Sequence, residues 1–175
     1  MAVFKNNELI LEHSFDRSTK RHYLNGQVSV LHCHHYSTLY TQLALDAQKT
    51  ALLAESAEEA FYEYLAEYFD KHNLAAIATK IDIACQLYAA IGLGKMRVNY
   101  LGDDSGEVEL LSSHVDSGWI KKWSTYDAPV NYIGAGYITA MFSAVLAEQR
   151  NAFQANETQS IVMGAETSIF NVVRR

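Results

Sequence analysis

The hydrophobic pattern of the chain changes its period near Gly92 and Gly94, and this change constrains the fold more than any other feature of the sequence. Before the two glycines, apolar residues recur every three or four positions, which is the repeat of a helix with one buried face. After them, Met96, Val98 and Tyr100 alternate with other residues, as in a half-buried strand. Helices that are grouped apart from strands are typical of an α+β fold.

Three helices are expected before the glycines. The first carries an apolar stripe at Leu39, Leu43, Ala47 and Ala51. The pattern of 56–59, Ser-Ala-Glu-Glu, is that of a capping box, so a second helix is predicted to begin there. A third is capped by Asn73 and ends at the glycines. Ahead of the helices, we expect a strand or an arm over 3–15, a turn at 25–26 and a strand or helix lead-in at 28–30.

The second half of the sequence predicts two hairpins with a long helix between them. The glycine-rich turn 102–106 joins the alternating strand to a partner that carries Val108 and Leu110. An irregular stretch follows, and Pro129 is expected in the first turn of the long helix. The chain then closes with strands at 158–163 and 168–173. We therefore expect one domain, 1–175, with a helical part (1–94) and a hairpin-helix-hairpin part (95–175). Its helices should pack on one face of a four-stranded antiparallel sheet.

Composition narrows the classes of function. The chain has 175 residues, 49% of them hydrophobic, and a formal net charge of −6. Its basic residues are scattered, which argues against nucleic-acid binding. Two cysteines form no disulfide framework and favour a reducing compartment. Because we read neither a signal peptide nor an apolar run long enough for a membrane span, we expect a cytoplasmic protein.

Three local patterns in the second half resemble the 4-vinyl-reductase domain, a relative of the fold found in subunits of the TRAPP vesicle-tethering complex. They are Gly118-Trp119 after the hairpin, 128–130 leading into the long helix, and the ending 157–160, 163–164 and 168–170. The resemblance covers about the C-terminal half of the chain. It implies an α+β fold and the binding of a hydrocarbon, a phenol or a tetrapyrrole-like molecule, although fold alone does not fix function.

Some domains of this family hold a structural zinc, and the resemblance places its ligands at Asn131, Glu157, Ser160 and Ser168. The spacing is kept, but the cysteine thiolates are replaced by hydroxyl and amide groups, which are poor zinc ligands. We therefore expect no zinc at these four positions. Glu157 is then interpreted as an ordinary surface or turn carboxylate.

The segment His32-Cys33-His34-His35 is the strongest chemical signal in the sequence. Imidazole is a common transition-metal ligand and the usual proton carrier near neutral pH. In a strand, His32 and His34 would share a face, whereas in a helix His32 and His35 would. Three readings stay open: structural imidazoles at a helix start, a transition-metal site, and a proton-transferring catalytic group built from His32, His34 and His35. Cys33 is either a nucleophile beside them or a buried inert thiol.

Aromatic side chains gather around the expected start of the long helix and predict a concave site for a flat apolar ligand. The candidate ligand-binding residues are Tyr88, Trp119, Trp123, Tyr126, Tyr132 and Tyr137. The same rings would also suit a core or a dimer interface. Because Phe61, Tyr62, Tyr64 and Tyr68 crowd several sides of one helix, we expect a homodimer.

Three functions follow from these observations. The first is a module that binds a small, largely apolar or aromatic molecule in an enclosed pocket. The second is a metal- or histidine-dependent enzyme that uses His32, His34 and His35. The third is an assembly protein without a ligand, as in the vesicle-tethering relatives. The sequence does not identify a cofactor. Among cofactors, the residues favour a transition metal bound at the histidines.

Overall fold

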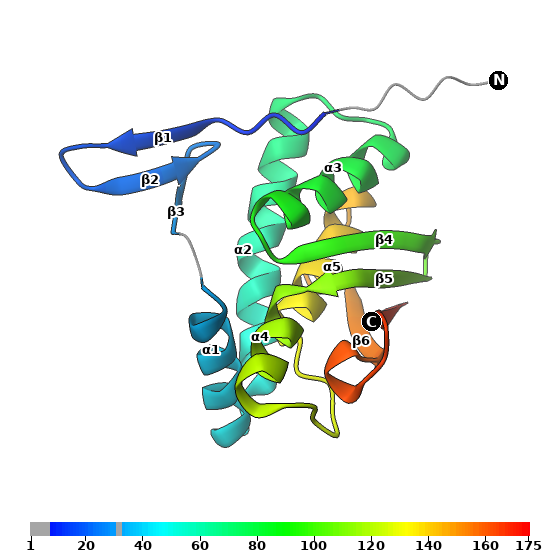
Figure 1. The fold of residues 1–175 in the computed structure, drawn as a ribbon. Helices are drawn as coiled ribbons and strands as arrows, with labels where there is room; N and C mark the ends of the chain where they lie inside the picture. The colour runs from blue at the N-terminus through cyan, green and yellow to red at the C-terminus, as the bar shows by residue number, and fades with distance from the viewer. Residues whose placement is uncertain (1–7, 31–32) are drawn as a thin grey trace.

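The computed structural model describes residues 8–30 and 33–175, and it has two antiparallel sheets and five α-helices in that part of the chain. The elements, in chain order, are β1 (His13–Asp16), β2 (Arg21–Leu24), β3 (Gln27–Ser29), α1 (His34–Asp46), α2 (Thr50–Lys71), α3 (Ile77–Ala90), β4 (Gly94–Leu101), β5 (Ser105–Ser113), α4 (His114–Trp123), α5 (Tyr132–Val145), β6 (Phe153–Gln159), the 3-10 turn η1 (Ile161–Met163) and β7 (Ser168–Arg174) (Figure 1).

The main sheet has four antiparallel strands in the order β4-β5-β7-β6 and is packed against helices, which confirms the predicted fold class. Its buried face follows the period-two pattern: Gly106, Val108 and Leu110 are buried on β5, and Val108 pairs with Phe170 of β7. The hairpin β4–β5 and its turn lie where the alternation predicted them.

Helix α5 lies between the main sheet and α2, and nearly all of its side chains are buried. Glycines allow both contacts to be close. A Cβ on Gly136 would lie 2.3 Å from the backbone oxygen of Ala54 on α2. On the sheet side, a Cβ on Gly106 would lie 2.3 Å from the ring of Phe142. The absence of a side chain at these positions therefore sets the spacing of three layers.

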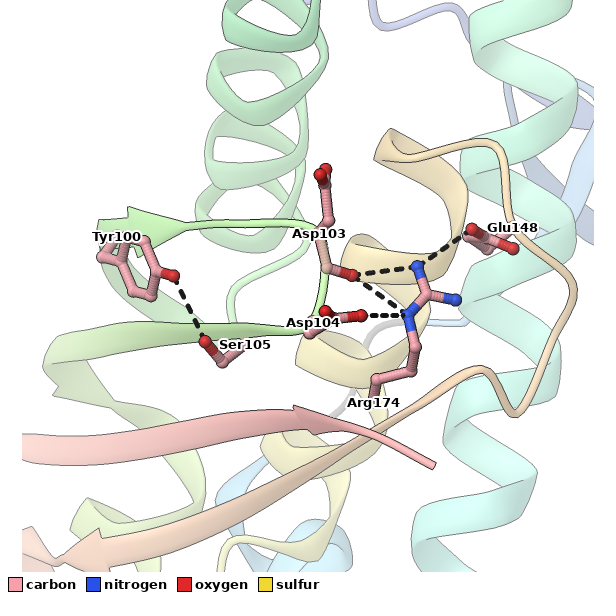
Figure 2. Close-up of polar contacts among 6 residues, drawn as sticks. All are labelled: Tyr100, Asp103, Asp104, Ser105, Glu148 and Arg174. Atoms are coloured by element: carbon pink, nitrogen blue, oxygen red, sulfur yellow. Dashed lines mark hydrogen bonds and ion pairs between the residues drawn. The ribbon is translucent and has the colours of Figure 1, made fainter.

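Polar contacts join the ends of several elements at one edge of the main sheet (Figure 2). The guanidinium of Arg174, at the end of β7, donates to Asp104 in the β4–β5 turn at 2.9 Å and to Glu148 after α5 at 3.0 Å. It also donates to the backbone oxygen of Asp103. These groups are exposed, so they fix the position of the turn more than they stabilise the fold.

Residues 8–30, called the arm below, form a second sheet that the sequence did not predict as a sheet. Its order is β1-β2-β3, and the hairpin β1–β2 projects from the body of the molecule (Figure 1). Side chains of the body accept backbone hydrogen bonds from the arm's first residues: Tyr68 from Ile10 at 2.9 Å, and Gln86 from Leu9 at 3.0 Å. The arm is thereby attached to α2 and α3.

The predicted first helix is wrong in extent and in its buried face. Helix α1 ends at Asp46, and Gln48 has a left-handed backbone (φ 55°) that breaks the chain before α2. Leu39 and Leu43, expected in the core, are 41% and 54% exposed. The helix instead buries its small polar face, which consists of Ser37, Thr38 and Thr41. Their hydroxyls donate to carbonyls one turn earlier, so burial leaves them satisfied.

Further boundaries also differ from the predictions. Helix α3 begins at Ile77 after Ala76, so Asn73 does not cap it. The segment 56–59 lies inside α2 and does not cap it; buried Glu58 instead accepts a hydrogen bond from the backbone of Asn151 at 2.7 Å. The stretch that was expected to be irregular is α4, and α5 begins at Tyr132, after Pro129. The penultimate strand covers 153–159 rather than 158–163, because the chain turns through η1.

Candidate functional site

In the structure, the predicted residue His34 lies beside His35 and beside His114, which was not part of the predicted group. His32 lies outside the described residues. His34 and His35 open α1, and their ring centroids are 4.2 Å apart. His114, the first residue of α4, meets His34 edge-on with the ring centroids 6.2 Å apart. Sequence reasoning had not joined His114 to this group, because 80 positions of chain separate it from His34 and the packing of α1 on α4 carries no local signal.

Close packing of α1 on α4 explains this meeting. A Cβ on Gly118 of α4 would lie 2.8 Å from Cβ of His34. The Nε2 atoms of His34 and His114 are buried without a hydrogen-bond partner in the described part of the chain. Burial, followed by the charges of His35, Lys121 and His114, lowers the pKa of His34. This shift favours the neutral imidazole, the form that binds metals and accepts protons.

Cys33 precedes this helix and is exposed, so the reading of a buried thiol is wrong for it. Within residues 8–30 and 33–175, no group of three or more His, Cys, Asp or Glu side chains is arranged to hold a metal ion. The transition-metal site at His32, His34 and His35 therefore stays a prediction.

The six aromatic residues that were predicted to bind a ligand lie in separate groups in the structure, and their role as a binding site stays a prediction. Tyr88 and Tyr137 stack edge-on inside the core at 4.8 Å, and Tyr137 donates to the backbone oxygen of Ala84 at 2.6 Å. A second group lies along α4 and after it: the ring of Trp119 is 4.7 Å from that of Trp123 and 5.2 Å from that of Tyr126. Tyr132, at the start of α5, is half-buried.

A recess of about 270 Å³ lies between the arm, α2 and α3, and we call it the arm recess. Its lining residues are Leu24, Gln27, Val28 and Ser29 of the arm, Ala60, Phe61, Glu63 and Tyr64 of α2, and Leu87 and Ile91 of α3 and its end. None of the six predicted aromatic residues is among them, although Phe61 packs edge-on against Tyr137 at 4.8 Å. No periodicity in the sequence indicated this recess, because the arm that closes it was not predicted as a sheet.

The arm recess combines apolar walls with a few polar groups. Phe61, Leu87 and Ile91 contribute apolar side chains to the lining, and Gln27, Ser29, Glu63 and Tyr64 are its polar residues. Burial raises the pKa of Tyr64 to about 12, so this residue keeps its proton at neutral pH. Such a surface suits a ligand with an apolar body and a single polar group. A larger hollow of about 470 Å³ beside α2 and α5 is more open and carries Asp70, Asn73 and Lys80, which makes it less suited to an apolar molecule.

The positions that resemble the family's zinc site form a buried polar cluster. Asn131, before α5, donates from Nδ2 to Ser113 at 3.0 Å and to Asp116 at 3.2 Å. Its Oδ1 accepts the backbone N–H of Gly134 at 2.9 Å and caps α5. The Ser168 hydroxyl accepts from the backbone of Ile161 at 2.9 Å. With no thiolate or imidazole described among these groups, the donor set does not fit zinc.

Glu157 is not the ordinary surface carboxylate that the sequence suggested. It is half-buried on β6, and its Oε1 has no hydrogen-bond partner among the described residues. Burial, followed by the nearby charge of Asp116, raises the pKa of Glu157 to about 7, while the hydroxyls of Ser168 and Ser160 oppose the rise. Burial also raises the pKa of Asp116.

Asp116 is a buried carboxylate that sequence reasoning did not single out. It is fully buried on α4, one turn before Trp119. A signal for its helix was present, because Ser113 followed three residues later by Asp116 is a helix-start pattern, and the Ser113 hydroxyl does accept the backbone N–H of Asp116 at 3.1 Å. Its burial depends on how α4 packs in the folded chain, and no local pattern encodes that packing.

In the part of the chain that the structure describes, no helix combines the length and apolar character needed to cross a membrane. No protein-family model matches the sequence. No curated protein matches it either.

Solved structures nevertheless share the fold. The phenol-responsive sensory domain of the transcription activator PoxR, solved with phenol, matches with a TM-score of 0.76 and 15% identity over 93% of this chain and 84% of that one. A vinyl-4-reductase family protein from Methanocaldococcus jannaschii matches with a TM-score of 0.58 and 15% identity over 84% of each chain. Trafficking protein particle complex subunit 3 from Naegleria fowleri, covalently bound to palmitic acid, matches with a TM-score of 0.54 and 14% identity. The match covers 81% of this chain and 91% of that one. These likenesses confirm the predicted resemblance of fold.

Proposed function

We propose that the chain binds a small, largely apolar or aromatic molecule in the arm recess. The observation that carries the proposal is the recess itself, which has apolar side chains from three elements and a few polar residues in its lining. A cavity of roughly 150 Å³ suffices for benzene in another protein, so about 270 Å³ accommodates a ring with a short substituent. The apolar body would be held by burial, and the polar residues of the lining would orient the polar group.

The fold of two relatives supports a ligand of this class. The PoxR domain was solved with phenol, and the trafficking subunit was solved with covalently bound palmitic acid. Both ligands have a large apolar part and one polar end. The arm contributes to the surface available to such a molecule, since Leu24 and Val28 line the recess together with Phe61 and Leu87.

A substitution that fills the recess tests this function. Ala60 is exposed on α2 and lines the recess, so Ala60→Trp should block it without disturbing the core. Ala51→Trp, on the same helix and equally exposed, is the matched control because it does not line the recess. Calorimetric titration with 4-ethylphenol and toluene should show binding to the wild type and the control and none to Ala60→Trp. Equal binding to all three proteins, or binding to none, would contradict the proposal.

A second candidate is a histidine-dependent enzyme, and it is favoured by the convergence of His34, His35 and His114. A neutral imidazole with a free ring nitrogen is suited to take a proton or to bind a metal. Elemental analysis of the untagged protein tests the metal form of this idea, with His34→Ala and His114→Ala compared with His72→Ala as the control. Near-stoichiometric metal in the wild type and in His72→Ala, together with loss of metal in His34→Ala and His114→Ala, would support this idea. Equal metal contents in all of them would contradict it.

A further inference from the structure

Helix α1 packs with its polar side inward and its apolar side outward. The residues that it buries are small and polar: Ser37, Thr38 and Thr41. Its outer face carries apolar and aromatic side chains that are each about half exposed, at Tyr36, Leu39, Tyr40 and Leu43. These four positions follow the spacing i, i+3, i+4 and i+7, so they form one stripe, called the α1 stripe below. A helix on the surface of a protein normally turns such a stripe toward the core.

This helix also carries almost no charge. Asp46, at its end, is the only Asp, Glu, Lys or Arg residue of α1. Helix faces that contact only water are usually rich in charged residues, whereas tyrosine enrichment and charge depletion are typical of the core of a protein–protein interface. A helix that lies on a membrane would carry Lys or Arg beside its apolar face. The composition of α1 therefore favours a protein partner over a lipid surface.

We infer that the α1 stripe is the contact surface for a second copy of this chain, with the two α1 helices antiparallel about a two-fold axis. The stripe is complementary to itself in this arrangement. When the axis passes between Leu39 and Tyr40, each tyrosine of one copy meets a leucine of the other. Tyr36 then lies against Leu43 of the second copy, and Leu39 lies against its Tyr40. Such reciprocal contacts, in which residue i meets j and j meets i, define a two-fold interface.

The two ends of α1 have complementary charges in the same arrangement. Asp46 lies at the C-terminal end of the helix, where the helix dipole disfavours a carboxylate. The N-terminal end has no acidic residue in its first turn and no side-chain cap. An antiparallel second copy places each Asp46 beside the N-terminal end of the other α1, where the dipole favours it. His35 and Asp46 are about three helical turns apart and flank the stripe on one side, so His35 of the second copy lies next to Asp46 as well.

The area of the α1 stripe agrees with the size of a stable dimer interface. Tyr36 is 55% exposed, Tyr40 is 43% exposed and Leu43 is 54% exposed. With full areas of about 150 to 250 Å² for large side chains, the four residues present on the order of 400 Å² of surface. A standard interface buries about 800 Å² per partner, of which somewhat more than half is apolar. The stripe therefore supplies most of the apolar part of such an interface.

Sedimentation velocity of the full chain, measured over a range of concentrations, tests this inference. The wild type should sediment as a dimer of the 19.6 kDa chain. Tyr36→Lys and Leu43→Glu each place a charge against an apolar residue of the second copy, so each should raise the dissociation constant of the dimer by about tenfold or more. The double variant Tyr36→Lys/Leu43→Glu sets opposite charges against each other at both ends of the interface. It should therefore dimerise more tightly than either single variant.

Ile77→Glu, which replaces an exposed apolar residue of α3, is the matched control and should keep the dissociation constant of the wild type. All the substituted side chains are exposed, so the variants should fold, and circular dichroism checks this. A wild type that stays monomeric at the highest concentration would overturn the inference and leave the α1 stripe to a different protein. A dimer that neither single variant weakens would place the interface elsewhere. A double variant that dimerises no better than the single variants would exclude the antiparallel arrangement.

Discussion

Asn131 donates a hydrogen bond from its Nδ2 to Oδ2 of Asp116 at 3.2 Å, and this bond joins the start of α5 to α4 inside the protein. The same side chain caps α5 through Oδ1 and reaches Ser113 at the end of β5. One amide thus connects two helices and the central hairpin.

Removal of this amide should destabilise the fold. Asn131→Ala deletes the cap of α5 and leaves a buried carboxylate oxygen of Asp116 without its donor, so we expect a loss of about 2 to 3 kcal/mol in the free energy of unfolding. Urea unfolding measures this loss. Asn156→Ala, exposed on β6, is the control and should stay within about 0.5 kcal/mol of the wild type. A loss below about 1 kcal/mol for Asn131→Ala would mean that the network is not held by this residue.

The approach of α2 to α5 predicts a second effect. Alanine normally favours a helix over glycine by about 1 kcal/mol, but a Cβ at position 136 would lie 2.3 Å from the backbone oxygen of Ala54 and 2.8 Å from Cβ of Ala57. Gly136→Ala should therefore destabilise the protein by about 1 to 3 kcal/mol, because the backbone of α2 must move. Chemical denaturation monitored by circular dichroism checks this. A stabilised variant would show that the helices are farther apart than described.

Tyr137 provides a third prediction. Its hydroxyl donates to the backbone oxygen of Ala84 at 2.6 Å inside the core, so Tyr137→Phe leaves a buried carbonyl without this donor. We expect a loss of about 1 to 2 kcal/mol. Tyr100→Phe is a matched control, since the Tyr100 hydroxyl contacts Ser105 at the exposed surface, and it should change stability little (Figure 2). Equal losses in thermal or urea unfolding would contradict the burial of the Tyr137 bond.

The two cysteines should differ in reactivity and in its dependence on pH. Cys33 is exposed, whereas burial, followed by the charge of Asp82, raises the pKa of Cys85 to about 11. Alkylation needs the thiolate, so iodoacetamide at about pH 8 should label Cys33 and spare Cys85 in the folded protein. Labelling of Cys85 should rise only as the pH approaches its pKa. Peptide mass analysis measures both sites. Rapid labelling of Cys85 at about pH 8 would show that it is accessible.

Strong local patterns predicted the parts of the fold that depend on the nearest residues. The alternation after Gly94 and the turn at 102–106 placed the hairpin β4–β5, and the ending 168–173 placed β7. Local patterns failed where packing decides. Leu39 and Leu43 have helical spacing, yet the helix turns its small polar face inward because Gly118 and His34 bring α1 against α4. The 3-10 turn after Gln159 likewise moved β6 away from its expected place.

The candidate sites also combine features that local sequence patterns predicted with features that depend on packing between distant segments. The histidine segment was visible in the sequence, but its contact with His114 depends on two helices that are distant in the chain. The arm recess requires a sheet made of short strands, and the burial of Asp116 requires α4, which was expected to be irregular. The expected homodimer also stays a prediction, because the crowded aromatic residues of α2 find partners within the chain: Phe61 on Tyr137, and Tyr62 donating to the backbone of Glu148.

A crystal structure of the protein grown with 4-ethylphenol tests the central claim most directly. Our account predicts electron density for one ligand in the arm recess, with its ring between Val28 and Phe61. Ligand density only elsewhere, or an arm recess filled by the chain's own side chains, would contradict it.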